Sequence, residues 1–418
     1  MPDKAQKEAK DVADLILAFF RWLLMSIIIG GIGGFIGAFF HVSVNYATDI
    51  RAANPWLLWC LPLGGVVIAA LYKLTKMETT NTNAIIDSIH FGDKVPVLLA
   101  PVIFIATTVT HLCGGSAGRE GAALQIGGGI GCNVGTFFKL DDKDMRLATL
   151  CGMSAVFSAL FGTPLTAALF ALEVISVGVF YYSGIVPCIV SAVTAYGVTL
   201  MLNIAPTKFA VSMPALDVDM LWRVAILAIL CAAASTIFCI AMHGSEKLAA
   251  RVLPNNYIRA AVGGALIIGL TLLVGTTDYN GAGMDVITNA IELGSARPSA
   301  AFWKLVFTAV TLACGFRGGE VVPTFFIGAT LGCVIGPLLG IPAGFSAALG
   351  LIAVFCGAVN CPVASIVMSI ELFGSTELIY FAVACGISYM LSGYFGLYSS
   401  QKIMYSKTRA EFINIQAK

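Results

Sequence analysis

The stretch GGSAGREGAALQIG, residues 114–127, places an arginine and a glutamate side by side in a chain that is otherwise suited to lipid. Of the 418 residues, 58% are hydrophobic and 11% are charged, and the mean hydropathy is +0.90, which is far from the balance of a soluble domain. Apolar runs of the membrane-spanning kind recur at 23–40, 55–72, 96–113, 183–203, 220–242, 258–275, 347–359 and 377–395. Because these runs lack the alternation of a transmembrane barrel, the sequence predicts an all-α polytopic membrane protein.

The glycine-rich stretch has a counterpart in the second half of the chain. The segment THLCG at 110–114 matches TLACG at 311–315. At the same offset of 201, four residues match four others, namely Gly127, Gly131, Cys132 and Gly135 with Gly328, Gly332, Cys333 and Gly336. At an offset of 198, GMSAVF (152–157), Pro164 and Glu173 match GLIAVF (350–355), Pro362 and Glu371. The common order and nearly constant offset indicate an internal duplication.

The duplication predicts how the chain is divided. We expect an N-terminal membrane repeat at 1–203 with a cytoplasmic N-terminal helix, a polar linker at 204–219, and a C-terminal membrane repeat at 220–418 with a short cytoplasmic tail. In transporters such repeats commonly have inverted topology, and discontinuous helices meet at a substrate site near the membrane midplane. The sequence therefore predicts a transporter-like fold of this kind.

Two glycine-rich loops at matching positions are predicted to lead into helices. CGGSAGREG (113–121) precedes a helical run that begins near Ala122, and CGFRGGEVVP (314–323) precedes one that begins near Thr324. Irregular backbone at membrane depth is tolerated only where it is buried or lines a cavity. Helix starts placed there would direct free N–H groups and positive dipole ends at one point, which predicts an anion site made without a lysine. The glycines that follow the loops have the small-xxx-small spacing of helix packing.

Glu120 is the most informative single residue. An ionisable side chain inside a membrane span costs about 3 kcal/mol, which makes it a candidate functional residue. One alternative is a structural ion pair with Arg119. In the other, Arg119 is anchored elsewhere while Glu120 faces a cavity, because adjacent residues at a helix start point in different directions. A carboxylate in an anion's path can occupy the anion's place when charged and leave it when protonated, so one residue could gate the path and carry protons.

Three further polar sites have two interpretations each. In TTNTNAIIDSI (79–89), Asn81, Thr82 or Asn83 is a candidate helix N-cap, which does not exclude contact with a ligand. Tyr398 is either an interfacial aromatic or part of a site. His111 is either a packing histidine or a proton carrier.

Charge and cysteine patterns exclude other classes of function. A net charge of +1 without a basic stripe argues against a nucleic-acid partner. The twelve cysteines are scattered through apolar segments without a C-x-x-C pair, so we interpret them as buried hydrophobes and predict no metal or cofactor. The N-terminus lacks the pattern of a removable signal peptide. Basic residues at Lys4, Lys7, Arg21 and Lys402, among others, favour a cytoplasmic location for both termini.

GREG at a helix start, GGEVVP at the equivalent place in the second half and a late tyrosine together resemble the CLC family of anion channels and anion/proton antiporters. The resemblance covers essentially the whole chain. GGEVVPTFFIGATLG and GYFGLYSSQK look like the fluoride-transporting CLC-F branch. The resemblance implies a bacterial protein that crosses the lipid bilayer of the cell membrane several times and acts as a homodimer. It also implies exchange of fluoride for protons in fluoride resistance, without a cofactor.

The same resemblance assigns roles to individual residues. Glu120 would be the gating and proton-coupling glutamate, Tyr398 the central tyrosine that faces the anion, and Asn81 would stand where chloride members have a serine. Backbone of Val321 and Val322 would form the second-half wall of the anion site. The flanking residues of the first loop, Gly118, Arg119 and Gly121, would complete it. An asparagine amide supplies two donors where a serine hydroxyl supplies one, which suits small, strongly hydrated fluoride.

The sequence departs from the branch pattern at two positions, because Val322 stands where the branch often has threonine and Ala122 stands where proline or threonine is usual. Val174 stands where chloride/proton antiporters have an inner proton-relay glutamate. The absence of that glutamate fits the fluoride branch but also resembles chloride channels. A chloride-selective CLC channel or exchanger is therefore the main alternative. An intramembrane enzyme using His111 and Glu120 as an acid–base pair is the alternative from another class, although no nucleophile or metal cluster accompanies them.

Overall fold

The computed structural model describes residues 2–418, with side chains from residue 10 onward, so Lys4 and Lys7 lie outside the described side chains. The first half contains helices α1 (Pro2–Ala53), α2 (Leu61–Leu74), α3 (Thr82–Phe91), α4 (Leu99–Cys113), α5 (Glu120–Phe137), α6 (Asp142–Phe161), α7 (Pro164–Glu173) and α8 (Ile185–Met201). The second contains α9 (Val218–Val252), α10 (Asn256–Val274), α11 (Met284–Glu292), α12 (Ala300–Ala313), α13 (Val321–Ile335), α14 (Ala343–Val359), α15 (Pro362–Phe373) and α16 (Leu378–Leu391).

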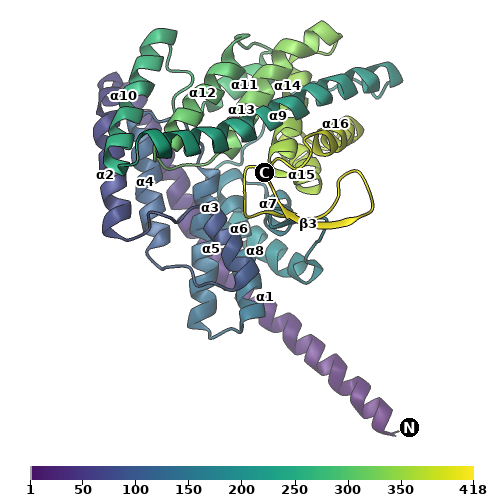
Figure 1. Cartoon of the computed structure of the whole chain (residues 1–418). Coiled ribbons are helices and arrows are strands. Elements are labelled where there is room, and N and C mark those ends of the chain that lie inside the picture. Colours follow the sequence, from purple (N-terminus) through teal and green to yellow (C-terminus); the bar gives the residue numbers. More distant parts are fainter. Residues whose placement is uncertain (1) are drawn as a thin grey trace.

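These helices confirm the predicted all-α polytopic membrane fold. Within the described residues, seven helices are long and apolar enough to cross a membrane. The N-terminal end of α1 projects away from the other helices, and its residues 10–21 are exposed (Figure 1). The described segment 202–217 joins α8 to α9 without helix or strand.

The C-terminal tail differs from the plain basic tail that the sequence suggested. It forms a hairpin of β2 (Lys402–Tyr405) and β3 (Phe412–Gln416), and β2 also pairs in parallel with the short strand β1 (Ser176–Val177). Val177, Ile403 and Ala417 form a small buried cluster under the sheet. Their burial explains why the tail folds back on the membrane part.

Close helix crossings confirm that the spaced glycines pack helices. In α5, a side chain at Gly131 would clash with the backbone of Ala148 in α6. In α13, a side chain at Gly332 would clash in the same way with Ser346 in α14. The two helix pairs are built alike because both depend on glycine for contact between backbones.

Reciprocal hydrogen bonds join the two halves at the offsets seen in the sequence. The Ser116 N–H donates to Thr311 Oγ1 at 3.0 Å, and the Arg317 N–H donates to Thr110 Oγ1 at 3.2 Å. Each contact is therefore the image of the other, displaced by 201 residues. This exchange is what a two-fold relation between inverted repeats produces, and it places the two glycine-rich loops against each other.

Two glutamates cap helices of the opposite half. The carboxylate of Glu173 accepts from the N–H groups of Val363 (3.1 Å) and Ala364 (2.8 Å) at the start of α15. The carboxylate of Glu371 accepts from the N–H groups of Leu165 (3.0 Å) and Thr166 (2.8 Å) at the start of α7. Each half thus supplies the negative charge that satisfies a helix N-terminus in the other half.

Candidate functional site

The two glycine-rich loops bring the starts of α5 and α13 together. α5 begins at Glu120 and α13 at Val321, slightly earlier than the predicted starts near Ala122 and Thr324. Gly118 and Gly319 form an antiparallel bridge, in which each N–H donates to the other's carbonyl at 2.7 Å. This bridge fixes the loops up to the first helical residue, so helical hydrogen bonding begins where the bridge ends. The helices therefore begin earlier than predicted because of a contact between the two halves of the chain.

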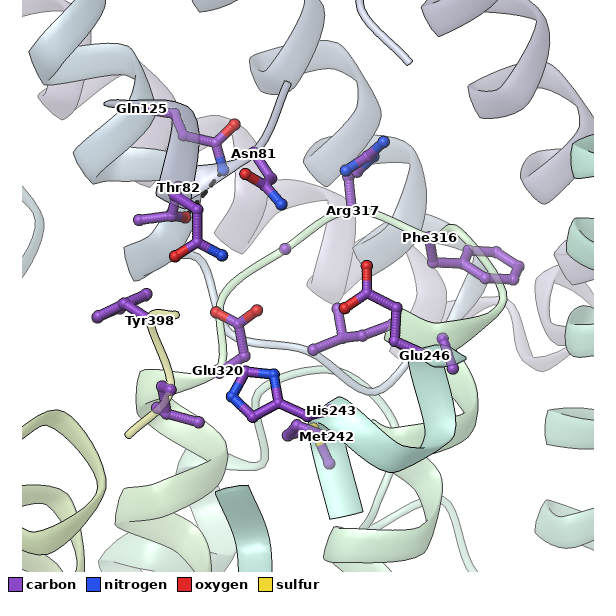
Figure 2. A pocket seen from close by; sticks show the side chains of 15 residues that line it. Asn81, Thr82, Gln125, Met242, His243, Glu246, Phe316, Arg317, Glu320 and Tyr398 are labelled. Atoms are coloured by element: carbon purple, nitrogen blue, oxygen red, sulfur yellow. Dashed lines mark hydrogen bonds between the residues drawn. The ribbon is translucent and has the colours of Figure 1, made fainter. Parts of the chain in front are cut away.

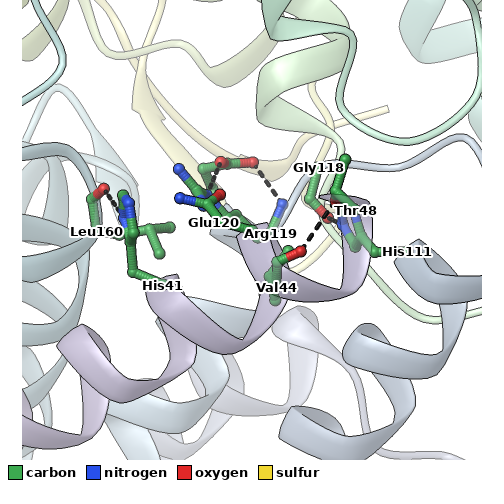
Figure 3. A network of polar contacts seen from close by, with 9 residues as sticks. His41, Val44, Thr48, His111, Gly118, Arg119, Glu120 and Leu160 are labelled. Carbon is green, nitrogen blue, oxygen red and sulfur yellow. Dashed lines mark hydrogen bonds and ion pairs between the residues drawn. The ribbon is translucent and has the colours of Figure 1, made fainter. Parts of the chain in front are cut away.

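The carboxylate of Glu120 occupies the point where both helices begin. The Glu120 side chain is 0% exposed. Its Oε2 accepts from the Arg119 N–H at 2.9 Å (Figure 3). The carboxylate also lies near the backbone N–H of Val322. Helix N-termini favour negative charge through free N–H groups and the helix dipole. The protein's own carboxylate therefore sits where an anion would be stabilised.

Arg119 combines the two arrangements that the sequence left open. Its Nη1 donates to Asn45 Oδ1 of α1 at 2.6 Å, while its Nε lies 4.0 Å from Glu120 Oε1. Oε1 of Glu120 has no hydrogen-bond partner among the described residues. The guanidinium is anchored mainly on α1 and leaves one carboxylate oxygen unsatisfied.

His111 is held against the loop backbone. Its Nε2 lies 3.3 Å from the carbonyl oxygen of Gly118, and its Nδ1 has no partner among the described residues. No hydrogen bond joins it to Glu120 in the described part of the chain. The contact fits a histidine that supports the loop.

A larger cavity adjoins the loop that carries Arg119. It has a volume of about 530 Å³, and we call it the Arg119 cavity. Its lining comes from the C-terminal end of α1, from the Arg119 loop and from the segment before α11, and it includes Asn45, Thr48, Arg51, His111, Arg119, Asp278 and Asp285. Glu120 itself, among the described residues, lines neither this cavity nor the one described next.

A smaller cavity of about 100 Å³ lies beyond the Gly118–Gly319 bridge, and we call it the Tyr398 cavity (Figure 2). Asn81 lines it as the N-cap of α3, which confirms the predicted cap, and its Oδ1 accepts from the Ala84 N–H at 3.2 Å. Tyr398 is 2% exposed, and its hydroxyl has no partner among the described residues. Burial rules out the interfacial interpretation of Tyr398.

The predicted site residues therefore gather in two neighbouring groups. Six lie at the helix starts and in their loops, namely Gly118, Arg119, Glu120, Gly121, Val321 and Val322. Asn81 and Tyr398 face the adjoining Tyr398 cavity. Within the described residues, no cluster of metal-ligating side chains is found and all twelve cysteines are free.

Glu320 is a residue of this site that the sequence interpretation passed over. It precedes α13, lines the Tyr398 cavity, and has a buried Oε2 without a partner among the described residues. A β-carbon on Gly121 would lie 3.3 Å from that oxygen, so the carboxylate packs close to the start of α5. The rule that singled out Glu120, an ionisable side chain at membrane depth, applies equally to Glu320.

Comparison with known proteins decides the family. The model of the voltage gated chloride channel family matches residues 64–393. The chain belongs to this family, the CLC family. A chloride/fluoride channel protein of Pseudomonas syringae pv. tomato is 37% identical over 405 residues, which cover 94% of this chain and 89% of that protein.

Other CLC relatives cover both anion types. The crystal structure of a CLC-type fluoride/proton antiporter is 29% identical, has a TM-score of 0.88, and matches 92% of this chain and 98% of that one. An H(+)/Cl(-) exchange transporter of Vibrio campbellii is 25% identical over 393 residues, which cover 86% of this CLC chain and 83% of that protein. The relatives are channels and transporters, and the chain is an integral membrane protein of a fluoride- and chloride-transporting family.

Proposed function

We propose that this CLC protein is a fluoride/proton antiporter that exports cytoplasmic fluoride in exchange for protons, with Glu120 as gate and proton carrier. The observation that carries the proposal is the position of the Glu120 carboxylate at the joint start of α5 and α13. A charged carboxylate there takes the place of the transported anion. When it is protonated it loses its attraction to the two helix starts, so an anion can replace it.

The two cavities supply the route on either side of this gate. The Arg119 cavity reaches Arg119, and the Tyr398 cavity reaches Glu320 and the loop before α13. In the proposal both termini are cytoplasmic, so the Tyr398 cavity, beside the C-terminal segment, opens inward. The Arg119 cavity, at the C-terminal end of α1, then opens outward.

Two donors at the Tyr398 cavity favour fluoride as the anion. The cap of α3 uses Oδ1 of Asn81, which leaves its Nδ2 amide group to donate to an ion. The Tyr398 hydroxyl, buried and without a partner among the described residues, is a second donor. The similarity to a chloride/fluoride channel protein and to a fluoride/proton antiporter supports the same choice. In the proposal the protein is a homodimer with one pathway per subunit, in a bacterial cell membrane.

Flux measurements in liposomes test the proposal. The purified protein is reconstituted in vesicles loaded with equal fluoride and chloride, and efflux of each ion is recorded with ion-selective electrodes while internal pH is followed. Fluoride-preferring efflux driven by proton uptake is expected. Glu120→Gln should abolish proton coupling, because the amide cannot exchange a proton. Equal or chloride-preferring efflux would instead place the protein with the chloride-transporting relatives, and coupling that survives Glu120→Gln would refute the role of Glu120.

A further inference from the structure

Two titratable side chains of α9 line the Tyr398 cavity close to its anion donors. His243 and Glu246 lie about one turn apart on this helix, and both belong to the cavity lining. Glu246 is exposed and His243 is half-buried. Glu320 lies in the same lining, with its buried Oε2 unpaired among the described residues. Figure 2 shows these three side chains around one cavity, so an imidazole and two carboxylates share a space that reaches solvent.

The hydrogen bond of His243 leaves its other ring nitrogen as a base. Nε2 lies 2.8 Å from the carbonyl oxygen of Gly396. Because a carbonyl oxygen only accepts, the proton of the neutral ring is on Nε2 and the lone pair is on Nδ1. The contact with Gly396 thus prepares the ring to take up and release a proton at Nδ1.

Three other carboxylates, outside the lining of the Tyr398 cavity, are already engaged in hydrogen bonds. Glu173 and Glu371 each accept two backbone N–H groups at a helix start. Asp87 accepts from the Ser400 hydroxyl at 2.8 Å. Val174, at the position where the resemblance places an inner proton-relay glutamate, is apolar and buried. Beside Glu320, His243 and Glu246 supply the imidazole and the exposed carboxylate in the lining of the Tyr398 cavity.

We propose that His243 and Glu246 form an inner proton port, which moves protons between Glu320 and cytoplasmic water. The inference rests on the proposed antiport function. In the inward direction, the Glu320 carboxylic acid gives its proton to Nδ1 of His243, which leaves a carboxylate and an imidazolium. The imidazolium then releases the Nδ1 proton to Glu246 or to water. Throughout, the Nε2–H stays on the ring and donates to the Gly396 carbonyl oxygen. Each step moves one proton and needs no other reactant.

The charges around the port are consistent with this role. Glu320 lies within electrostatic range of both Glu246 and Glu120, which links the port to the gate. The loop before α13 adds Arg317, which stacks over the Tyr72 ring at 4.1 Å and donates to the Glu78 carbonyl at 3.4 Å. The remaining polar groups in the lining are Asn81, Thr82, Asn83, Gln125 and the phenol Tyr398. The three proton-carrying side chains of the lining, one imidazole and two carboxylates, therefore lie in the same cavity as one permanent positive charge, Arg317.

The test compares conservative variants of the full-length protein in liposomes. His243→Gln keeps an amide donor for Gly396 but has no basic nitrogen, and Glu246→Gln keeps size and polarity. Glu411→Gln in the exposed turn of the C-terminal hairpin is the matched control. Fluoride efflux and proton uptake are recorded together from the same starting internal pH, with inorganic phosphate inside the vesicles at low or high concentration. Fluoride binding to each variant is measured by calorimetry.

Both port variants should slow coupled exchange by about 100-fold, the lower end of the range for loss of a positioned acid–base group. The fluoride-to-proton ratio and fluoride binding should stay at wild-type values. High internal phosphate should restore part of the rate in the port variants, because a small buffer can accept the proton in their place. Wild type and Glu411→Gln should not respond to phosphate.

The outcomes separate this inference from the proposed function. Wild-type rates in both port variants, or a loss accompanied by weaker fluoride binding and no response to phosphate, would overturn the port. Fluoride transport without proton coupling in the wild type would overturn the antiport function and the port with it. Because Glu246 is exposed, Glu246→Gln should fold normally and decides the matter even if His243→Gln does not.

Discussion

Asn81 uses its two polar side-chain atoms for different tasks. Oδ1 caps α3 by accepting from the Ala84 N–H, and Nδ2 remains as a donor at the Tyr398 cavity. Serine is about as good an N-cap as asparagine, but it has no amide group. Substitution by serine therefore separates the structural role of the residue from its proposed role in binding.

We expect Asn81→Ser to leave thermal stability unchanged and to weaken fluoride binding about 10-fold or more, since a hydrogen bond to a charged group contributes about 1.5–3 kcal/mol. Calorimetric titration with fluoride and a melting curve in detergent check the two parts. Asn81→Ala is the comparison variant, and it should lose stability as well, by about 1 kcal/mol. Unchanged fluoride binding in Asn81→Ser would exclude the amide from the site.

Tyr398 has a buried hydroxyl that forms no hydrogen bond with the described residues. An unsatisfied buried polar group destabilises the fold, so Tyr398→Phe should be as stable as the wild type or slightly more stable. Fluoride binding should fall, because the ion loses a donor. A melting curve and a fluoride titration on the same sample test this pair of effects, and a variant that is both less stable and unimpaired in binding would contradict it.

At the residue scale, the sequence singled out side chains whose charge is unusual in a membrane span. Glu120 was identifiable because a charge at membrane depth needs a reason, and the same rule was available for Glu320. The anchoring of Arg119 on Asn45 was not predictable, because the two residues lie 74 positions apart and neither carries a local signal for the other. The unpaired Tyr398 hydroxyl likewise depends on three-dimensional packing.

At the scale of elements, α5 contains glycines with opposite surroundings. Gly131 lies against the backbone of α6, whereas the nearest atom to a β-carbon on Gly129 is Val95 Cγ1 at 3.8 Å. Alanine at these two positions has the same helix propensity and differs only in the space that it meets.

Gly131→Ala should therefore destabilise the protein by about 1–3 kcal/mol through overpacking of α5 against α6. Gly129→Ala should be neutral or stabilising by up to about 1 kcal/mol, since alanine favours the helix. Thermal melting followed by size-exclusion chromatography compares the two. Equal effects would show that the crossing with α6 does not require glycine.

The reciprocal caps give a second prediction at this scale. Glu371→Gln should lower stability by about 2 kcal/mol, because the start of α7 loses charge-assisted hydrogen bonds and a favourable helix-dipole interaction. The fluoride-to-proton ratio should not change, since Glu371 is not on the proposed proton route. Melting curves and liposome flux measured on one preparation check both statements, and loss of coupling would place Glu371 on the route.

The positions of most elements follow from the sequence, and the exceptions have identifiable causes. The apolar runs and glycine-rich loops predicted the helices and the meeting of the two loops. The starts of α5 and α13 were misplaced by a few residues because the Gly118–Gly319 bridge is a contact between halves. The hairpin of β2 and β3 was missed because its pairing partner β1 lies more than 220 residues earlier in the chain.

At the scale of the whole molecule, a half-buried lysine, Lys407, joins the C-terminal hairpin to the helices. Lys407 Nζ donates to the Tyr389 carbonyl (2.9 Å), to Ser392 Oγ (3.1 Å) and to Asn360 Oδ1. Burial lowers the pKa of Lys407 from 10.5 to about 8. Between these two values the unfolded chain binds more protons at this position than the folded protein does, so stability should rise as pH increases.

Melting curves from pH 8 to 10.5 should therefore show a rising contribution from Lys407. Lys407→Met removes the titrating group and should remove that part of the slope. The difference between the wild-type and variant curves isolates it from other groups that titrate in the same range. Parallel curves would mean that the Lys407 ammonium stays charged in the folded tail.

The exchanged caps of Glu173 and Glu371 carry a consequence for the history and biogenesis of the chain. A single half, made alone, would have one helix start without its carboxylate and one carboxylate without its helix start. Both defects disappear when a second copy inserts in the opposite orientation. An unduplicated ancestor would thus have had both caps only as a dimer of oppositely oriented copies. During synthesis of the present chain, the start of α7 gains its cap only after Glu371 has been made.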